Sequence, residues 1–280
     1  MKKLLSANFS RLFHSKIYWL GMIFMFGFAA FAVASRFRDK LVAPDYAYPT
    51  ADGLWFVGGM YFAIVLAVFI SIWVGTDYSD GTIRNKLSVG HTRAEIYSSN
   101  WIVCTVASLM MHVIYILTVW GAGYLLLGKF ETPTKTLVLC TLASLVTVIA
   151  MSSLFLLLAM LIHNKATGAV VSMILALVLL FGAMTVMQML SAPELVGGFT
   201  VSVNGEMRYI ERQPNPDYLS GIKREIFQFI LDFQPGGQMI QYGMSESLPT
   251  NFARFPIYSL LFVFITVAGG WGFFRRKDLK

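Results

Sequence analysis

Charge is scarce in this chain and absent from its long apolar runs. Of the 280 residues 56% are hydrophobic and only 13% are charged, with a mean hydropathy of +0.64. A soluble domain carries about twice that charged fraction. None of the 15 Asp and Glu or 22 Lys and Arg residues lies inside an apolar run, and His112 is the one histidine that does. Ion-driven transporters usually need intramembrane carboxylates or broken helices that bind the coupling ion, and a membrane enzyme needs converging catalytic groups or metal ligands near the bilayer. The sequence shows neither, so neither class fits.

Several catalytic and binding motifs are also missing. The sequence contains no G-x-x-x-x-G-K-[ST] phosphate-binding loop, so this chain cannot hydrolyse ATP by that route. Its two cysteines, Cys104 and Cys140, lie in different apolar runs at depths roughly 25–30 Å apart, too far for a disulfide. We therefore expect no catalytic residue, no metal site and no cofactor, and we expect that the protein is not an enzyme. If it moves a solute uphill, a separate polypeptide supplies the energy.

Six apolar runs make up half of the chain. Each approaches or exceeds the ~20 residues that cross ~30 Å of hydrocarbon at 1.5 Å per residue. The sequence therefore predicts an all-α membrane protein with six transmembrane helices in one domain, residues 1–280. The four-residue link 163–166 predicts that the fourth and fifth helices are tightly paired antiparallel neighbours. The predicted spans are 17–35, 54–76, 101–127, 136–162, 167–191 and 256–274.

The basic residues indicate which loops face the cytoplasm. One set of loops carries 12 Lys and Arg residues, whereas the two short loops on the other side carry 5. Positive loops stay inside, so we expect both termini to be cytoplasmic. The net charge of +7 is spread over all the loops rather than gathered on one face, which argues against a nucleic-acid partner. The predicted inner segments are 1–16, 77–100, 163–166 and 275–280, and the short outer ones are 36–53 and 128–135.

An amphipathic stretch precedes the first span. In residues 1–16 the apolar side chains recur at helical spacing, which predicts an elbow helix lying in the inner membrane interface. The alternative is that these residues simply begin the first span. The Ala32-Val33-Ala34 segment has the character of a signal-peptidase site. The apolar run before it is longer than the ~7–15 residues of a signal core, so we expect a retained anchor.

The polar segment 77–100 has its own predicted structure. Asp80-Gly81 signals a turn, and Thr82 can cap a short helix that Gly90 ends. Thr92-Arg-Ala-Glu95 has the form of a capping box, which predicts the start of the helix that continues into the third span.

Residues 192–255 form the longest predicted non-membrane segment. Thr200–Val203 and Glu206–Ile210 flank Asn204-Gly205, the strongest short signal for a β-hairpin. Apolar residues from Ile222 to Phe233 then follow helical spacing, and Pro235-Gly236-Gly237 is expected to end that helix. We expect a small external cap that rests on the membrane between the fifth and sixth spans.

Three segments together resemble the ABC-2 type permeases, the membrane subunits of bacterial ABC exporters. They are Asp80-Gly-Thr-Ile-Arg-Asn-Lys-Leu87, Gly90-His-Thr-Arg-Ala-Glu-Ile-Tyr97 and Gly272-Phe-Phe-Arg-Arg-Lys-Asp-Leu279. The resemblance implies a coupling helix after the second span that docks on a separate ATP-binding subunit. Family members usually carry Glu before the Gly-Thr pair, whereas here Asp77 and Asp80 flank the turn, and which acid plays that part is open. The implied coupling residues are Asp80, Gly81, Thr82, Ile83, Arg84, Asn85, Lys86 and Leu87.

Within that segment we expect Arg84 and Lys86 to make charged contacts with the ATP-binding subunit, and Ile83 and Leu87 to form an apolar plug. The resemblance implies a permease in the bacterial plasma membrane, with two copies of the ATP-binding subunit, a second permease that is identical or paralogous, and surrounding membrane lipid. An uncharged, aromatic-rich interior favours export of an amphipathic or hydrophobic substrate such as a peptide, lipid or drug. The alternative is a non-transporting immunity or sensor protein that binds a peptide through its external cap.

Overall fold

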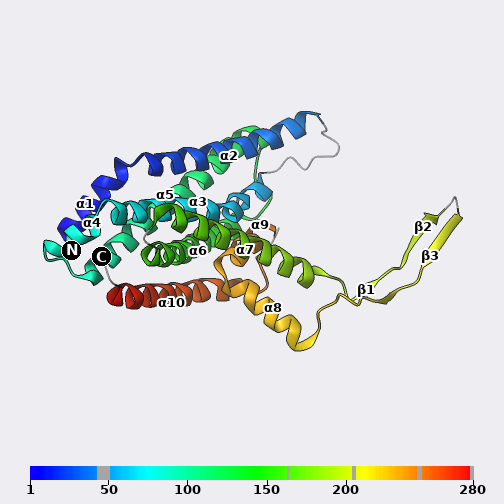
Figure 1. The fold of residues 1–280 in the computed structure, drawn as a ribbon. Coiled ribbons are helices and arrows are strands. Elements are labelled where there is room, and N and C mark those ends of the chain that lie inside the picture. The colour runs from blue at the N-terminus through cyan, green and yellow to red at the C-terminus, as the bar shows by residue number, and fades with distance from the viewer. Residues whose placement is uncertain (43–50, 163, 204–205, 245–247, 278–280) are drawn as a thin grey trace.

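The protein is a bundle of long helices (Figure 1). A computed structural model describes residues 1–42, 51–162, 164–203, 206–244 and 248–277. Within these ranges six helices are long and apolar enough to cross a membrane, which confirms the predicted fold class. The six are α2 (Lys16–Val42), α3 (Val57–Ser79), α5 (Arg93–Leu127), α6 (Thr134–Leu161), α7 (Lys165–Ser191) and α10 (Phe255–Arg276).

Several of these helices run past the apolar residues that predicted them. The helix α2 continues seven residues beyond Ser35 to Val42, through a charged segment. There Lys40 donates a hydrogen bond from Nζ to the carbonyl of Leu127, at the end of α5, at 3.2 Å. Hydropathy marks the residues that suit lipid, whereas backbone hydrogen bonding continues until a helix breaker intervenes. The predicted outer loop 36–53 is therefore helical in its first part.

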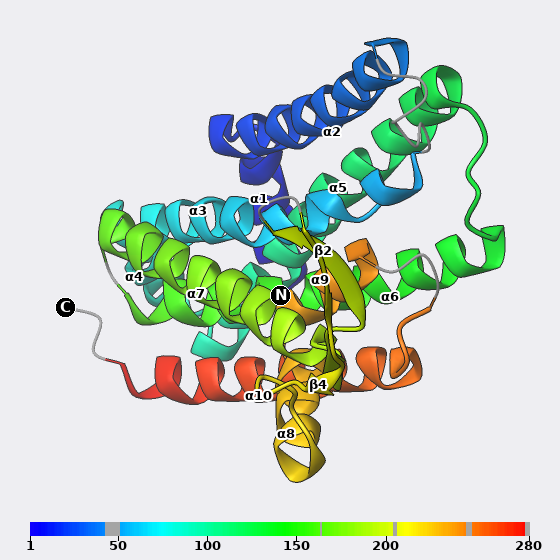
Figure 2. The same ribbon diagram turned by 90° about the vertical axis from the view of Figure 1, so that its right-hand side faces the viewer.

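The helices form an inner and an outer set. The spans of α3, α5 and α6 are more than half buried, whereas those of α2, α7 and α10 are mostly exposed. In the outer set, α2 packs chiefly on α5, α7 on α3 and α10 on α6 (Figure 2). The outward faces of α2, α7 and α10 are rich in large apolar side chains, as a membrane environment requires.

The helices α6 and α7, predicted as tightly paired antiparallel neighbours, are in contact but are not tightly paired. Instead, α7 packs much more extensively against α3. Gly75 explains this close approach, because a Cβ there would lie 2.6 Å from the Cα of Lys165. Farther along, the Ser71 hydroxyl donates to the Ser172 hydroxyl at 2.9 Å and to the carbonyl of Gly168 at 3.2 Å. Small residues and hydroxyl pairs of this kind hold membrane helices together, and a short link constrains only helix ends.

Two short helices lie at the end of the bundle where α1 begins and α10 ends (Figure 1). The predicted N-terminal helix is present as α1 (Lys2–Phe13), and α2 begins separately at Lys16. The second short helix, α4 (Thr82–Ser88), follows α3. A 3₁₀ turn at Asp52–Leu54 leads into α3, and another at Phe252–Arg254 leads into α10.

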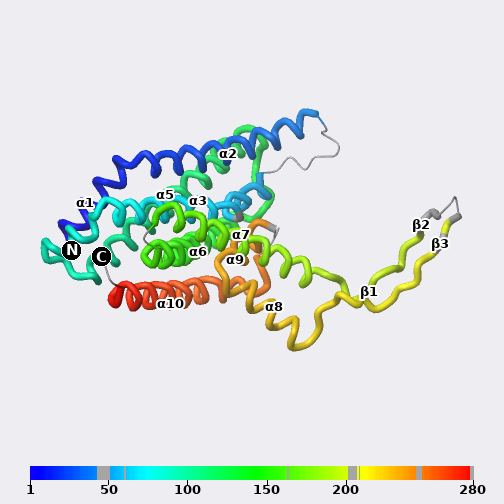
Figure 3. Tube along the Cα trace, viewed as in Figure 1, coloured from blue at the N-terminus to red at the C-terminus, as the bar shows by residue number. Residues whose placement is uncertain are grey.

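A long arm extends from the opposite end of the bundle (Figure 3). The predicted hairpin is confirmed, since Phe199 pairs with Ile210 and Val203 with Glu206, although Asn204-Gly205 lies outside the described residues. The amphipathic helix predicted next is α8 (Gly221–Phe233). The arm strands are β1 (Leu195–Val196), β2 (Phe199–Val203), β3 (Glu206–Ile210) and β4 (Gln213–Pro214), paired as β1–β4 and β2–β3.

The Pro235-Gly236-Gly237 segment ends one helix, as predicted, and also begins another, which the sequence did not predict. The new helix, α9 (Pro235–Met244), packs against α3, α6 and α7 and buries Met239 and Tyr242. Proline suits a first helical position because the N–H it lacks would have no partner there. It also forces the residue before it into an extended conformation, and Gln234 has φ −80° and ψ 136°.

Candidate coupling surface

The turn between α3 and α4 depends on a glycine. Gly81 has φ 67°, in the left-handed region that a side chain disfavours, and it is the N-cap of α4. The prediction that Thr82 caps this helix is wrong, because Thr82 is already helical and no side chain caps the helix. Gly90, with φ 94°, follows the other end of α4. The capping box is confirmed: the Thr92 hydroxyl accepts from the Glu95 amide, and the Glu95 carboxylate accepts from the Thr92 amide.

The two faces of α4 differ in character. Ile83 is 1% exposed, and Leu87 packs against the same apolar core, so these side chains face the protein. An apolar plug formed by them on another subunit is therefore inconsistent with this structure. The sequence showed that the pair shares one helix face, but it did not show where that face points. Arg84, Asn85 and Val89 are exposed, and Val89 keeps 80% of its surface.

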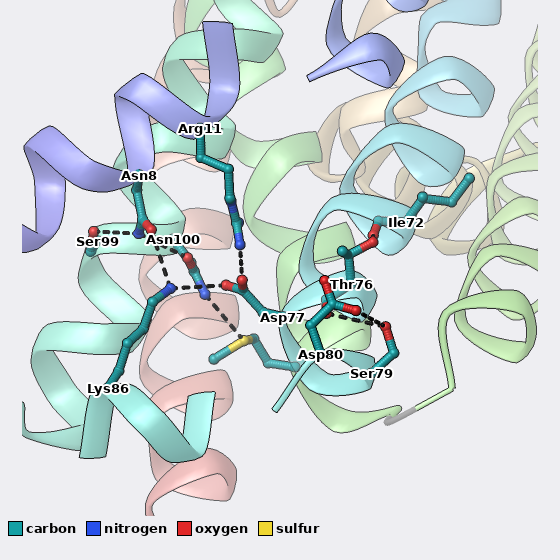
Figure 4. Close-up of polar contacts among 11 residues, drawn as sticks. Asn8, Arg11, Ile72, Thr76, Asp77, Ser79, Asp80, Lys86, Ser99 and Asn100 are labelled. Atoms are coloured by element: carbon teal, nitrogen blue, oxygen red, sulfur yellow. Dashed lines mark hydrogen bonds and ion pairs between the residues drawn. The ribbon is translucent and has the colours of Figure 1, made fainter. Parts of the chain in front are cut away.

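Lys86 also turns inward, toward a buried carboxylate. Its ammonium lies 3.0 Å from Oδ2 of Asp77, which is fully buried at the end of α3, and Arg11 of α1 pairs with Oδ1 of the same carboxylate (Figure 4). Lys86 also donates to the side-chain oxygen of Asn8 at 3.1 Å. We call Asn8, Arg11, Asp77 and Lys86 the Asp77 cluster. It joins α1, α3 and α4 through charged hydrogen bonds.

The Asp77 cluster is also anchored to α5. Asn8 donates to the Ser99 hydroxyl at 2.8 Å and to the side-chain oxygen of Asn100 at 3.2 Å. The guanidinium of Arg11 stacks over the Trp73 ring, 3.8 Å from its centroid. The four residues of the Asp77 cluster and these three partners come from α1, α3, α4 and α5, so α4 has a fixed place on the bundle.

Burial determines the electrostatics of the Asp77 cluster. Desolvation, with a smaller effect of the neighbouring Arg11 charge, lowers the pKa of Lys86 to about 8. Desolvation likewise lowers the pKa of Arg11 to about 10. Both groups are charged at neutral pH and share a single carboxylate. Separating either from Asp77 would leave a poorly solvated charge, which makes the cluster costly to break.

Asp77 and Asp80 have opposite environments although they are only three positions apart. Asp80 is exposed, and its carboxylate accepts from the Ser79 hydroxyl at 3.2 Å. The sequence left open which acid has the structural part, and burial assigns the ion pairs to Asp77. The sequence offered Asp77 only as an alternative to Asp80, and it missed Arg11 and Asn8 as site residues. An acid directly after an apolar run, with a lysine nine positions later, was the available signal.

A second set of contacts holds the end of α10 against the start of α5 and the end of α6. Arg93 at the start of α5 donates to the carbonyls of Phe274 and Lys277. Lys277 donates in turn to the carbonyls of Met160 and Leu161, at the end of α6, at 2.7 and 2.9 Å. These cations lie where the helix dipoles of α10 and α6 are negative. The three segments singled out in the sequence therefore meet at one end of the bundle, apart from residues 278–280, which are not described.

Comparison with known proteins identifies the family. A family model described as "ABC-2 family transporter protein" matches residues 4–183, from α1 through most of α7, and so includes the Asp77 cluster and α4. No curated protein sequence matches the chain. The described residues contain no group of three or more potential metal ligands. With six membrane-spanning helices and this match over more than half its length, the chain belongs to the ABC-2 transporter family, as a multi-pass permease subunit of an ABC transporter whose family implies partnership with an ATP-binding subunit.

Proposed function

We propose that this permease exports an amphipathic or hydrophobic substrate and that α4 is its docking helix for a separate ATP-binding subunit. The observation that carries the docking assignment is the two-sided character of α4. Its inner face is fixed by Ile83 and Lys86, while Arg84, Asn85 and Val89 are exposed. A surface that is free outward and rigid inward suits the transfer of force.

The Asp77 cluster gives that force a route into the membrane helices. A push on α4 is carried through Lys86 to Asp77 on α3 and, through the same carboxylate, to Arg11 on α1. Breaking a buried ion pair costs about 3–5 kcal/mol, whereas an exposed pair contributes about 0–1 kcal/mol. The helices α1, α3 and α4 therefore move together rather than slide past one another, as a rocking transition requires.

The assembly and its orientation follow from the same proposal. Two permease chains, identical or paralogous, bind two copies of the ATP-binding subunit. Because this chain has no P-loop, ATP hydrolysis is assigned to that subunit. The excess of basic residues beside α1, α4 and the end of α10 supports cytoplasmic termini in a bacterial plasma membrane. The uncharged spans favour a peptide, lipid or drug as cargo.

The two amphipathic helices fit the membrane surfaces in this orientation. α1 lies in the inner interface as an elbow helix. On the other side, α8 exposes four large apolar side chains that would rest on the outer leaflet as part of the cap. These are Ile222, Ile226, Phe229 and Ile230.

Co-purification tests the docking assignment. An affinity-tagged chain expressed with its ATP-binding subunit should retain that subunit and show substrate-stimulated ATPase activity. The combined substitutions Arg84→Glu and Val89→Asp should abolish both. Lys3→Glu changes an exposed charge on α1 and should preserve both.

Two results would contradict the proposal. Retention of the complex and of stimulated ATPase activity in the Arg84→Glu/Val89→Asp variant would show that α4 is not the docking surface. If the wild-type chain retains no ATP-binding subunit but still protects cells from a peptide, the immunity or sensor function is correct instead.

A further inference from the structure

A groove runs between α5 and α10 on the outside of the bundle. Its volume is about 510 Å³ and its lining is mainly apolar. One wall includes Tyr97 and Trp101 of α5, and the other includes Phe264, Ala268 and Trp271 of α10. α10 belongs to the exposed outer set of helices, so this groove opens toward the surroundings of the bundle.

The groove has the length of one membrane leaflet. Along α10 its lining extends from Leu260 to Trp271, which corresponds to about 16 Å at 1.5 Å per residue. Half of the hydrocarbon core measures about 15 Å. The groove also ends near the last turn of α10, where the polar region of the membrane is expected. These dimensions suit a lipid acyl chain.

A second hollow adjoins the groove at the end of α10. It has a volume of about 620 Å³, shares Trp271 with the groove, and is lined by Gly272, Arg275 and Arg276 among others. A Cβ at Gly272 would meet no atom within 4 Å, so the glycine leaves open space. The guanidinium of Arg275 lies 5.8 Å from the centroid of the Trp271 ring. A tryptophan with neighbouring arginines is typical of the headgroup level of a membrane.

Both arginines can form an ion pair with a bound anion. Arg275 and Arg276 are exposed, and neither forms an ion pair with any residue that the structure describes. Guanidinium groups match the geometry of phosphate oxygens. The phosphate oxygens of a lipid are acceptors, so they complement the donors of both arginines.

We propose that this site binds an anionic phospholipid from the leaflet on the side of α4. One acyl chain occupies the groove between α5 and α10, and the phosphate lies against Arg275 and Arg276. A zwitterionic lipid brings a cationic group beside its phosphate, whereas two arginines that have no ion-pair partner among the described residues favour a net negative headgroup. The proposal is independent of the docking of α4.

Lipid retention measured on the purified full chain tests the site. The chain in mild detergent is titrated with phosphatidylglycerol or phosphatidylcholine of identical acyl chains, and bound lipid is counted by native mass spectrometry. Two arginines near a lipid headgroup give a preference for phosphatidylglycerol of about 30-fold. The double variant Arg275→Gln/Arg276→Gln should lose this preference. Arg36→Gln/Arg38→Gln removes two exposed arginines from the other end of the bundle and should retain it.

A second pair of variants tests the groove itself. Ala268→Trp fills the groove from an exposed position and should reduce binding of both lipids, with an unchanged melting temperature showing that the chain is folded. Phe264→Cys, at a side chain 71% exposed, should form no disulfide-linked dimer under oxidation in membranes. Equal retention of the two lipids, or a preference that survives Arg275→Gln/Arg276→Gln, would overturn the proposal. Disulfide-linked dimers of Phe264→Cys would assign the groove to a second permease instead.

Discussion

Replacing Asp77 by asparagine removes the carboxylate of the Asp77 cluster while keeping the size of the side chain. Lys86 and Arg11 then face each other without a counter-charge, and their side chains are only 12% and 31% exposed. The asparagine amide would also point its NH2 group at either Lys86 or Arg11. Both cations are hydrogen-bond donors only, so that contact would place two donors face to face. We expect the variant to be strongly destabilised and to lose the attachment of α4 to α1 and α3.

The magnitude follows from the burial of the three groups. Breaking a buried ion pair by removing one partner costs about 3–5 kcal/mol. The partial exposure of Arg11 lets water relieve part of this cost, so we expect about 3 kcal/mol, near the lower limit. In chains of 150–250 residues each kcal/mol corresponds to about 2–4 °C of melting temperature, and we apply the same range to these 280 residues. The melting temperature should therefore fall by about 6–12 °C.

Thermal unfolding in detergent, followed by loss of the folded peak in size-exclusion chromatography, measures this shift. Asp80→Asn is the matched control, because it makes the same chemical change at an exposed carboxylate three residues away, and it should shift the melting temperature by less than about 2 °C. Adding Lys86→Met to Asp77→Asn should cost less than Lys86→Met alone, since the ammonium has already lost its counter-charge. Equal shifts for Asp77→Asn and Asp80→Asn would refute the reasoning.

Three further changes have expected outcomes. Thr92→Ala removes the hydroxyl that caps α5 and should cost about 1 kcal/mol, measured as a lower melting temperature. Gly75→Val would force the Cα of Lys165 away from a 2.6 Å approach and should cost about 1–3 kcal/mol, whereas Gly182→Val, with nothing within 4 Å, should be milder. Burial lowers the pKa of Lys277 from 10.5 to about 8, so the unfolded chain binds the proton more tightly between these values. Stability should rise with pH across that window, and the rise should be smaller in Lys277→Met when melting temperatures are compared at pH 7.5 and 10.

The membrane spans could be predicted from the sequence because their signal is local. A run of about 20 apolar residues is stable in a bilayer as a helix. The hairpin and the capping box are likewise predicted by motifs of a few consecutive residues. The pairing of helices is not local. The link at 163–166 brought the ends of α6 and α7 together, but Gly75 and Ser71 on α3 decided which helix packs along the length of α7.

The orientation of α4 was unpredictable for a related reason. The spacing of Ile83 and Leu87 showed a shared apolar face, which is equally suited to another subunit and to the chain's own core. Which way this face points depends on the packing of α1 and α5. The helix α1 is distant from α4 in the sequence, and α5 follows it. The same holds for α9, because a Pro-Gly-Gly segment is a good helix terminator and, with proline first, also a good helix start.

The arrangement around Gly81 explains how one short segment can be both rigid and available. Asp77 is buried in the last turn of α3, whereas Asp80, directly after that helix, is exposed, so one carboxylate pairs with Arg11 and Lys86 while the other remains at the surface. The left-handed turn at Gly81 then reverses the chain so that Lys86 returns to Asp77. Substitution at Gly81 would strain the turn and separate those two charges even though a Cβ there touches nothing. The left-handed conformation of Gly81 and the buried charge of Asp77 thus act together: the first brings Lys86 back to α3, and the second binds it there, which fixes α4 to the bundle.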